Sequence, residues 1–175
     1  KEFDGTLTDN TLLNRASTLS IVDDLLAENN VDSLPKRILT TDPIDNRYYY
    51  FTALPIVSGS EVVGVVVVGT SVNTIMPALK TTSLADVVLY DANGQALATT
   101  LISQGTDGGL FLRTISIPVE TYNQTIGQDE VVEGDNLSVD ERWFKVARGP
   151  LQIGDDRLAV FAVILPLDFV VEKSS

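Results

Sequence analysis

Hydrophobic residues in the first half of the chain recur first at helical spacing and then at strand spacing. Apolar residues three and four positions apart predict a helix over 9–30, with Asn29-Asn30 as its stop. Residues 47–56 read as an aromatic strand ending at Pro55, and 58–60 as a turn containing Gly59. The run 61–69, EVVGVVVVG, is apolar without alternation, which predicts a strand buried on both faces.

The second half continues with short strands and turns. Ser71 caps a predicted helix over 71–80 that Pro77 must bend or interrupt. Asn93-Gly94 marks a tight hairpin turn between the predicted strands 84–90 and 95–101. Further strands are predicted over 84–90, 95–101, 110–119, 142–151 and 157–165, with a surface loop over 127–140 around a short strand, EVVEG.

Two stretches repeat the same unit at a fixed offset. Pro150 follows Pro55 by 95 positions, and Gly154 follows Gly59 by the same number. Each copy runs aromatic strand, proline, glycine turn, very apolar strand. A period this long is typical of small domains rather than solenoid repeats. We therefore expect two related units, 1–80 and 81–175, with Phe3-Asp4-Gly5 as the tail of a first hairpin that is truncated at its N-terminus.

Three segments carry a resemblance to a known family. They are ALPIVSGSEVVGVVVVGTSV (53–72), ADVVLYDANGQALATT (85–100) and RWFKVARGPL (142–151) with the strand that follows it. Their order resembles the double-Cache sensor domains of bacterial and archaeal transmembrane receptors. The resemblance implies an α+β fold of tandem PAS-like (Cache) units, with antiparallel sheets flanked by helices. Residues 1–80 would be the membrane-distal unit and 81–175 the membrane-proximal one.

The resemblance also implies a role. Such domains are extracytoplasmic, are anchored in the membrane in the full-length protein, and feed a histidine kinase, chemoreceptor, nucleotide cyclase or phosphodiesterase. Dimerisation through N-terminal helices is common among them, so a homodimer is one expected assembly. The amino-acid-binding subset carries an Asp just after the strand equivalent to 61–69. This chain has Gly69-Thr70-Ser71-Val72 there, which argues against amino-acid sensing by that route.

Composition narrows the chemistry. A net charge of −12 disfavours nucleic acid and anionic lipid as partners. Absence of Cys and His from the sequence excludes Ser-His-Asp and Cys-His nucleophiles and Cys/His zinc sites. Together with the resemblance, these exclusions lead us to expect no enzyme activity, no cofactor and no metal. The run 62–69 is far shorter than the roughly 20 residues that span a bilayer.

Two polar-aromatic clusters are candidate ligand sites. Arg47, Tyr48 and Tyr50 could grip a carboxylate or polar ligand, with ordinary sheet packing as the favoured alternative. Trp143, Lys145 and Arg148, close to Arg142, could attract an anion, with cross-strand ion pairs to Glu141, Asp155 or Asp156 as the favoured alternative.

The leading hypothesis is a non-catalytic sensor that binds a small molecule outside the cytoplasm. The alternative is a secreted or cell-surface binding or adhesion module without signalling output. A hydrolase built on carboxylates ranks last, because adjacent acidic residues such as Asp23-Asp24 do not face one bond of a substrate.

Overall fold

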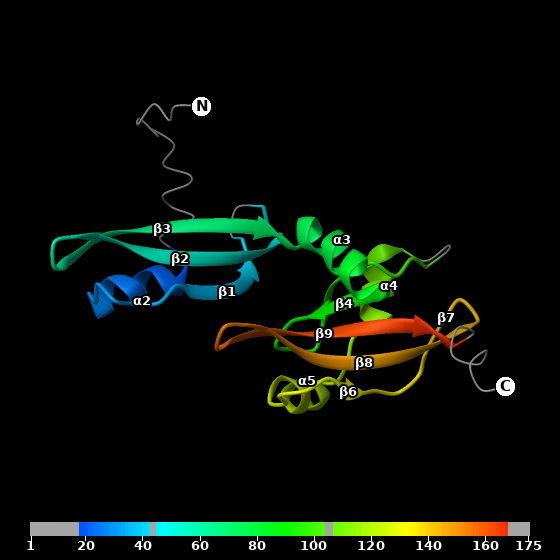
Figure 1. Cartoon of the computed structure of the whole chain (residues 1–175). Helices are drawn as coiled ribbons and strands as arrows, with labels where there is room; N and C mark the ends of the chain where they lie inside the picture. The colour runs from blue at the N-terminus through cyan, green and yellow to red at the C-terminus, as the bar shows by residue number, and fades with distance from the viewer. Residues whose placement is uncertain (1–17, 43–44, 104–106, 168–175) are drawn as a thin grey trace. The chain divides into compact units, whose positions relative to one another are not determined.

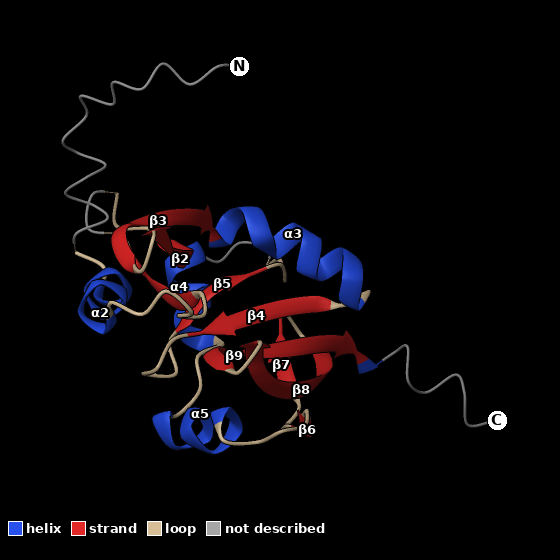
Figure 2. Cartoon of the chain, turned by 60° about the vertical axis from the view of Figure 1, so that its left-hand side comes forward, coloured by secondary structure: helices blue, strands red, loops and turns tan. Residues whose placement is uncertain are grey.

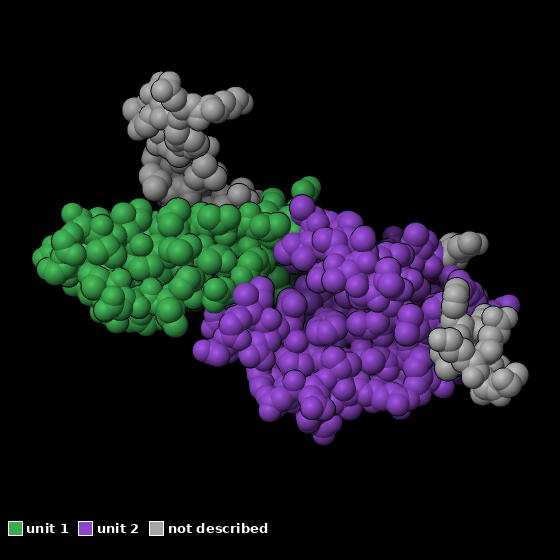
Figure 3. Space-filling model, viewed as in Figure 1, with its two compact units in different colours: residues 1–71 green, residues 72–175 purple. Residues whose placement is uncertain are grey.

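A computed structural model describes residues 18–42, 45–103 and 107–167. The chain divides into two compact units, residues 1–71 and 72–175, called here the first and second units (Figure 3). The division falls earlier than the expected boundary after residue 80. The reason is that helix α3 (Val72–Ser83), which continues through Pro77, packs on β4 (Asp86–Tyr90) and β5 (Ala96–Thr99).

The first unit is a three-stranded antiparallel meander with a helix on one face. Its strands β1 (Lys36–Thr41), β2 (Tyr48–Ser58) and β3 (Glu61–Ser71) pair in that order, and α2 (Ser20–Glu28) packs against them (Figure 1). Asn29 ends α2 in the left-handed conformation, as predicted, while positions 9–17 and Phe3-Asp4-Gly5 lie outside the described residues. The buried core of this unit consists of Leu19, Ile21, Leu25, Phe51 and Ala53.

The second unit has a six-stranded sheet between two helical layers. Its order is β5-β4-β9-β8-β6, and β7 also pairs with β8. Helix α3 lies on one face and α5 on the other (Figure 2). The remaining elements are α4 (Gly108–Thr114), α5 (Val119–Ile126), β6 (Val132–Glu133), β7 (Leu137–Val139), β8 (Arg142–Ile153) and β9 (Asp156–Pro166).

The predicted fold class is confirmed, because both units are antiparallel sheets flanked by helices. The core of the second unit lies between the sheet and helices α4 and α5, and it includes Val88, Tyr90, Phe111, Tyr122 and Ile164. Among the described residues, no helix is long and apolar enough to cross a membrane.

The two long hairpins pair in the same register, residue for residue. Pro55 faces Val65 in the β2–β3 pair, and 95 positions later Pro150 faces Val160 in the β8–β9 pair. Each hairpin has a register shift one residue after its proline. Both turns use a glycine at positive φ, +65° at Gly59 and +63° at Gly154. The repeat read from the sequence is therefore present in the backbone pairing.

The prolines lie inside these strands rather than at their ends. β2 was predicted to end at Pro55, but it continues to Ser58. Proline cannot donate to a neighbouring strand, so it needs a position where that neighbour is missing. β1 begins opposite Ala53, so on that side β2 has no partner at Pro55. In the same way β6 begins opposite Arg148, two residues before Pro150.

The prediction that 61–69 is buried on both faces is wrong. Val66 is 44% exposed and Val68 is 58% exposed. Within the described residues β3 pairs only with β2, and α2 covers only one face of its sheet. Its counterpart β9 lies between β8 and β4 and is the fully enclosed strand. The two strands are similarly apolar in sequence, but among the described residues β9 has two neighbouring strands and β3 has one.

This difference predicts unequal costs for one substitution. Val160 is fully buried between Tyr90 and Pro150, so Val160→Ala should destabilise the second unit by about 2–3 kcal/mol. Val65, its repeat equivalent, is half-buried, and Val65→Ala should cost about 1 kcal/mol in the first unit. Urea unfolding of each variant measures both values. Equal costs would contradict the lesser burial of Val65.

The predicted strand over 110–119 is also wrong, because this segment ends α4 and begins α5. Oδ1 of Asp107 accepts hydrogen bonds from the backbone N–H groups of Gly109 (2.9 Å) and Leu110 (3.2 Å), which caps α4. Phe111 and Ile115, four positions apart, are both buried. A helical spacing was therefore present beneath the apparent alternation.

Candidate ligand-binding site

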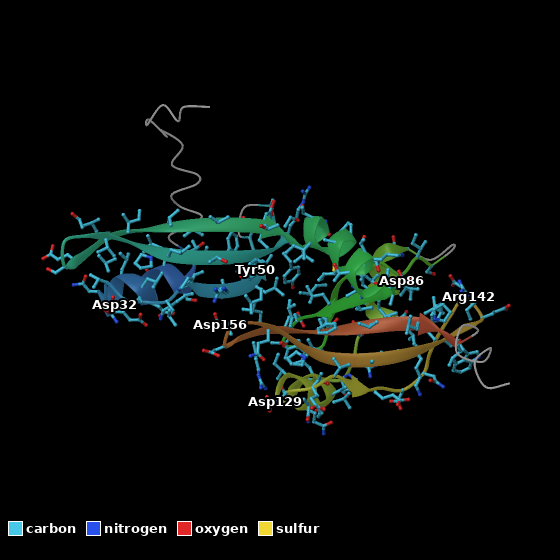
Figure 4. All side chains as sticks on the ribbon, viewed as in Figure 1. Asp32, Tyr50, Asp86, Asp129, Arg142 and Asp156 are labelled. Carbon is cyan, nitrogen blue, oxygen red and sulfur yellow. The ribbon has the colours of Figure 1, made fainter. Side chains whose placement is uncertain are left out.

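The first predicted cluster is divided between a turn and a strand. Phe51 and Ala53 pack toward α2, so Tyr48 and Tyr50 lie on the other face of β2 (Tyr50 is labelled in Figure 4). Arg47 precedes the strand and is exposed, and its backbone carbonyl accepts a hydrogen bond from the Asp42 N–H (2.7 Å). The structure thus brings the two tyrosines onto one face but leaves Arg47 in the turn.

The intervening aromatic residues serve packing. The rings of Tyr49 and Phe51 stack with centroids 5.6 Å apart. The Tyr49 hydroxyl donates to Oδ2 of Asp45 (2.8 Å), which ties the strand to the preceding turn. Tyr49 and Phe51 therefore follow the sheet-packing alternative, which accounts for half of the aromatic run 48–51.

The second predicted cluster is split between the two faces of β8. Trp143 is 57% exposed, and Lys145 pairs with Glu133 on the outer face. Arg148 instead shares its face with buried Phe144 and Val146, the face covered by α5. The alternative of a cross-strand ion pair therefore applies to Lys145, but its partner is Glu133 rather than Glu141. It does not account for Arg148.

Arg148 lies at a cavity of about 490 Å³ between α5 and the β6 side of the sheet. Across the sheet, Val88, Ala162 and Arg148 form one row. The other residues around the cavity are mostly polar: Thr121, Gln124, Thr125, Gln128, Val132, Glu133, Gly134 and Asp135.

Tyr90 is the inner neighbour of Arg148. The Tyr90 side chain is 2% exposed, and burial raises the pKa of its phenol above the ordinary value of 10.0. The Arg148 guanidinium opposes that rise through its charge and a side-chain hydrogen bond. The phenol therefore stays neutral at physiological pH and leaves the positive charge of Arg148 uncompensated.

Two acidic residues near this site, Asp129 and Glu133, already have other partners. Arg157 pairs with Asp129 at 2.5 Å and also donates to the carbonyl of Ile126 at the end of α5 (2.7 Å). Glu133 pairs with Lys145. In the described part of the chain Arg148 makes no ion pair, and its Nε is buried without a hydrogen-bond partner. It is thus a cation facing a cavity with spare donors.

The raised pKa of Tyr90 predicts a loss of stability in alkali. A phenol whose folded pKa exceeds its unfolded value contributes fully below about pH 10, and the contribution is lost as pH rises through the folded pKa. Urea unfolding from about pH 8 to about pH 11 should show the second unit weakening. Tyr90→Phe should flatten this slope, whereas Tyr50→Phe in the first unit should not change it. An unchanged slope in Tyr90→Phe would contradict the assignment.

Other parts of the second unit offer less for polar recognition. A larger cavity of about 710 Å³ lies between α3 and the ends of β4 and β9. Its charges are already satisfied, because Lys80 pairs with Asp86 at 2.7 Å and Asp86 also accepts from the Thr100 hydroxyl (2.9 Å). In the described ranges, no three His, Cys, Asp or Glu side chains gather to hold a metal ion.

Sequence reasoning found Arg148 but missed its surroundings. Tyr90 was assigned to a strand without a role, and α5 was not assigned apart from Val119, which ended the predicted strand 110–119. The missed signal was Pro118, which directly precedes α5 and suits the start of a helix. With α5 recognised, Thr121 and Thr125 fall four positions apart on one side of the helix, and Gln128 follows just after its end.

Comparison with solved structures places the fold of this chain among known folds. The ligand-binding domain of the Pseudomonas fluorescens chemoreceptor CtaA, solved with L-serine, matches with a TM-score of 0.51 and 19% identity, over 96% of this chain and 65% of that one. The Campylobacter jejuni chemoreceptor Tlp3 domain, solved with 4-methylisoleucine, gives 0.50 and 13%, over 91% and 56%. A structure described as methyl-accepting chemotaxis protein X gives 0.51 and 18%, over 82% and 52%.

The chain has the fold of a chemoreceptor ligand-binding domain. The expected Cache-type sensor fold is thereby confirmed as a fold. The chain spans between about half and two thirds of the length of the solved domains it resembles. No protein-family model and no curated protein sequence matches it.

Proposed function

We propose that this chain is the extracytoplasmic, non-catalytic ligand-sensing part of a transmembrane signal-transduction receptor. The observation that carries the proposal is a sensor-type fold whose second unit holds a polar cavity beside an uncompensated arginine. A cavity of about 490 Å³ suits a small metabolite. The output would be a chemoreceptor, histidine kinase or cyclase module on the cytoplasmic side.

The ligand class follows in outline from the fold neighbours. The CtaA domain was solved with L-serine and the Tlp3 domain with 4-methylisoleucine, so small molecules of that size suit this fold. In this chain β3 ends in Gly69-Thr70-Ser71 and Val72 follows, so no acidic residue is there to pair with a ligand amine. Its ligand contacts would therefore differ from those of the amino-acid-binding subset that the sequence resembles.

Ligand binding would act by shifting the population between two packings. Helix α5 contacts both β8 and β9, and the cavity lies along its polar side. A ligand that fills the cavity stabilises the arrangement in which α5 and Arg148 both reach it. The equilibrium moves only as far as the ligand's affinity differs between the two states.

A thermal-shift screen tests the proposal. The chain is heated with a broad panel of small metabolites, including carboxylates, amines, sugars and neutral amides. A ligand at about 100 times its Kd should stabilise the domain by about 2.7 kcal/mol and raise Tm saturably. A panel without any saturable shift would count against a sensing role.

The complete protein provides a second test. A sensor should carry a membrane-spanning segment and a cytoplasmic signalling module in the same polypeptide, and its signalling output should respond to the ligand found in the screen. A secreted polypeptide without either feature would favour the binding or adhesion module instead.

A further inference from the structure

We infer that Arg148 is the anchor of a binding site for a small organic carboxylate in the second unit. This inference rests on the proposed sensing function and adds the location and the ligand chemistry. It starts from Arg148, which makes no ion pair within the described residues, and from its buried Nε, which has no hydrogen-bond partner. A partly buried charge in that condition is costly unless another group pairs with it.

The protein holds the guanidinium in place from two sides. The Tyr90 hydroxyl contacts it from the sheet interior, and the backbone of Gly134 lies against it from β6. A Cβ at Gly134 would overlap Nη1 of Arg148, so the absence of a side chain there makes room for the group. The Gly134 N–H donates to the carbonyl of Val146 (2.8 Å), which fixes this close approach. The arginine is therefore positioned before any ligand arrives.

A planar guanidinium with spare donors is best matched by a carboxylate, which accepts two parallel hydrogen bonds. Opposite Arg148, the α5 side of the cavity presents the amides of Gln124 and Gln128 and the Thr121 hydroxyl. These groups can bind the remaining polar atoms of a small organic acid. Most residues that line the cavity are polar, which favours a small polar ligand over a large apolar one.

Two acidic residues at the same cavity extend the argument. Asp135 is exposed at its rim, and Glu133 lies beside it while pairing with Lys145. These carboxylates would attract an amino group on a ligand already held through its carboxylate, and they would repel a second carboxylate. Each of these ligands would bind Arg148 through a carboxylate. Ligands with and without an amino group or a second carboxylate then show what the two acidic residues contribute.

Calorimetric titration of the chain with acetate, L-alanine, succinate and ethylamine tests the site. At least one of the three carboxylates should bind saturably, and Arg148→Gln should weaken that binding by about tenfold or more. Arg142→Gln is the matched control, because Arg142 lies on the same strand, is exposed, and stacks on the Phe144 ring (5.3 Å) away from the cavity. It should leave the affinity unchanged. Tighter binding of L-alanine than acetate would assign the amino group to the rim carboxylates.

A readout on the unmodified protein covers the case in which Arg148→Gln fails to fold. The Arg148 Nε–H signal in NMR spectra should shift saturably as acetate or L-alanine is added. Binding of ethylamine alone, or equal carboxylate affinity in the two variants, would overturn the site. If no carboxylate binds but another compound of the broad panel does, the Arg148 site fails and sensing stands. If the entire panel is silent, both fail.

Discussion

Gly94→Ala should destabilise the second unit by about 3–5 kcal/mol. Gly94 has φ +74°, a conformation that costs a residue with a Cβ about 1–2 kcal/mol. An added Cβ would also overlap the carbonyl oxygen of Ile117. That approach is built into the fold, because the Ile117 N–H donates to the carbonyl of Gly94 (2.9 Å). The turn and the start of α5 would have to separate.

Gly59 provides the control for this prediction. It has a similar φ of +65°, but a Cβ there would meet nothing within 4 Å. Gly59→Ala should therefore cost only the conformational term, about 1–2 kcal/mol in the first unit. Urea unfolding monitored by circular dichroism gives both values. Equal losses at the two glycines would show that the contact with Ile117 does not constrain position 94.

The loss at Gly94 should reach the candidate site as well. Ile117 immediately precedes Pro118 and α5, and α5 forms one side of the cavity. A shift of this segment would move Gln124 and Thr121 relative to Arg148. Carboxylate binding should weaken in Gly94→Ala even under conditions in which most molecules remain folded.

The sequence predicted the hairpins better than any other part of the fold. Proline, glycine turn and apolar strand recur with one offset, and the structure reproduces that offset in pairing and in the register shift after each proline. These features are encoded locally, since a turn glycine and a strand proline each restrict the backbone at their own position. Local rules therefore sufficed for the β2–β3 and β8–β9 pairs.

Features that depend on neighbours in space were not predictable in the same way. Burial of 61–69 failed because apolarity does not reveal how many strands flank β3. Strand β1 was not predicted, since all six of its residues are half-buried and show no alternation of burial. The helices after Asp107 and Pro118 were misread because short helices and short strands share apolar spacings over so few residues.

The candidate site shows the same limit. Alternation along 142–148 already implied that Arg148 and Lys145 point to opposite faces, so the predicted cluster could have been divided from sequence alone. What makes Arg148 distinctive is the lack of a counter-ion, and that depends on Glu133 being taken by Lys145 and on Tyr90 remaining neutral. Those relations exist only in the folded sheet.

Phe51→Ala should unfold the first unit while the second unit remains folded. Phe51 is 4% exposed, stacks on Tyr49, and fills the space beside Gly69, where a Cβ would lie 2.5 Å from its ring. Truncating a buried phenylalanine costs about 3–5 kcal/mol. The buried core of this unit includes only a few large side chains besides Phe51, chiefly Leu19, Ile21 and Leu25. A loss of that size approaches the whole stability of a small domain.

Phe111→Ala, which removes the same atoms from the core of the second unit, completes the experiment. Phe111 is 6% exposed and belongs to a separate hydrophobic cluster with Val88 and Tyr90. Each variant should lower one calorimetric transition and leave the other in place, and only Phe111→Ala should abolish carboxylate binding. If either substitution lowers both transitions together, the two cores unfold as one cooperative system, although their hydrophobic clusters are separate in the structure.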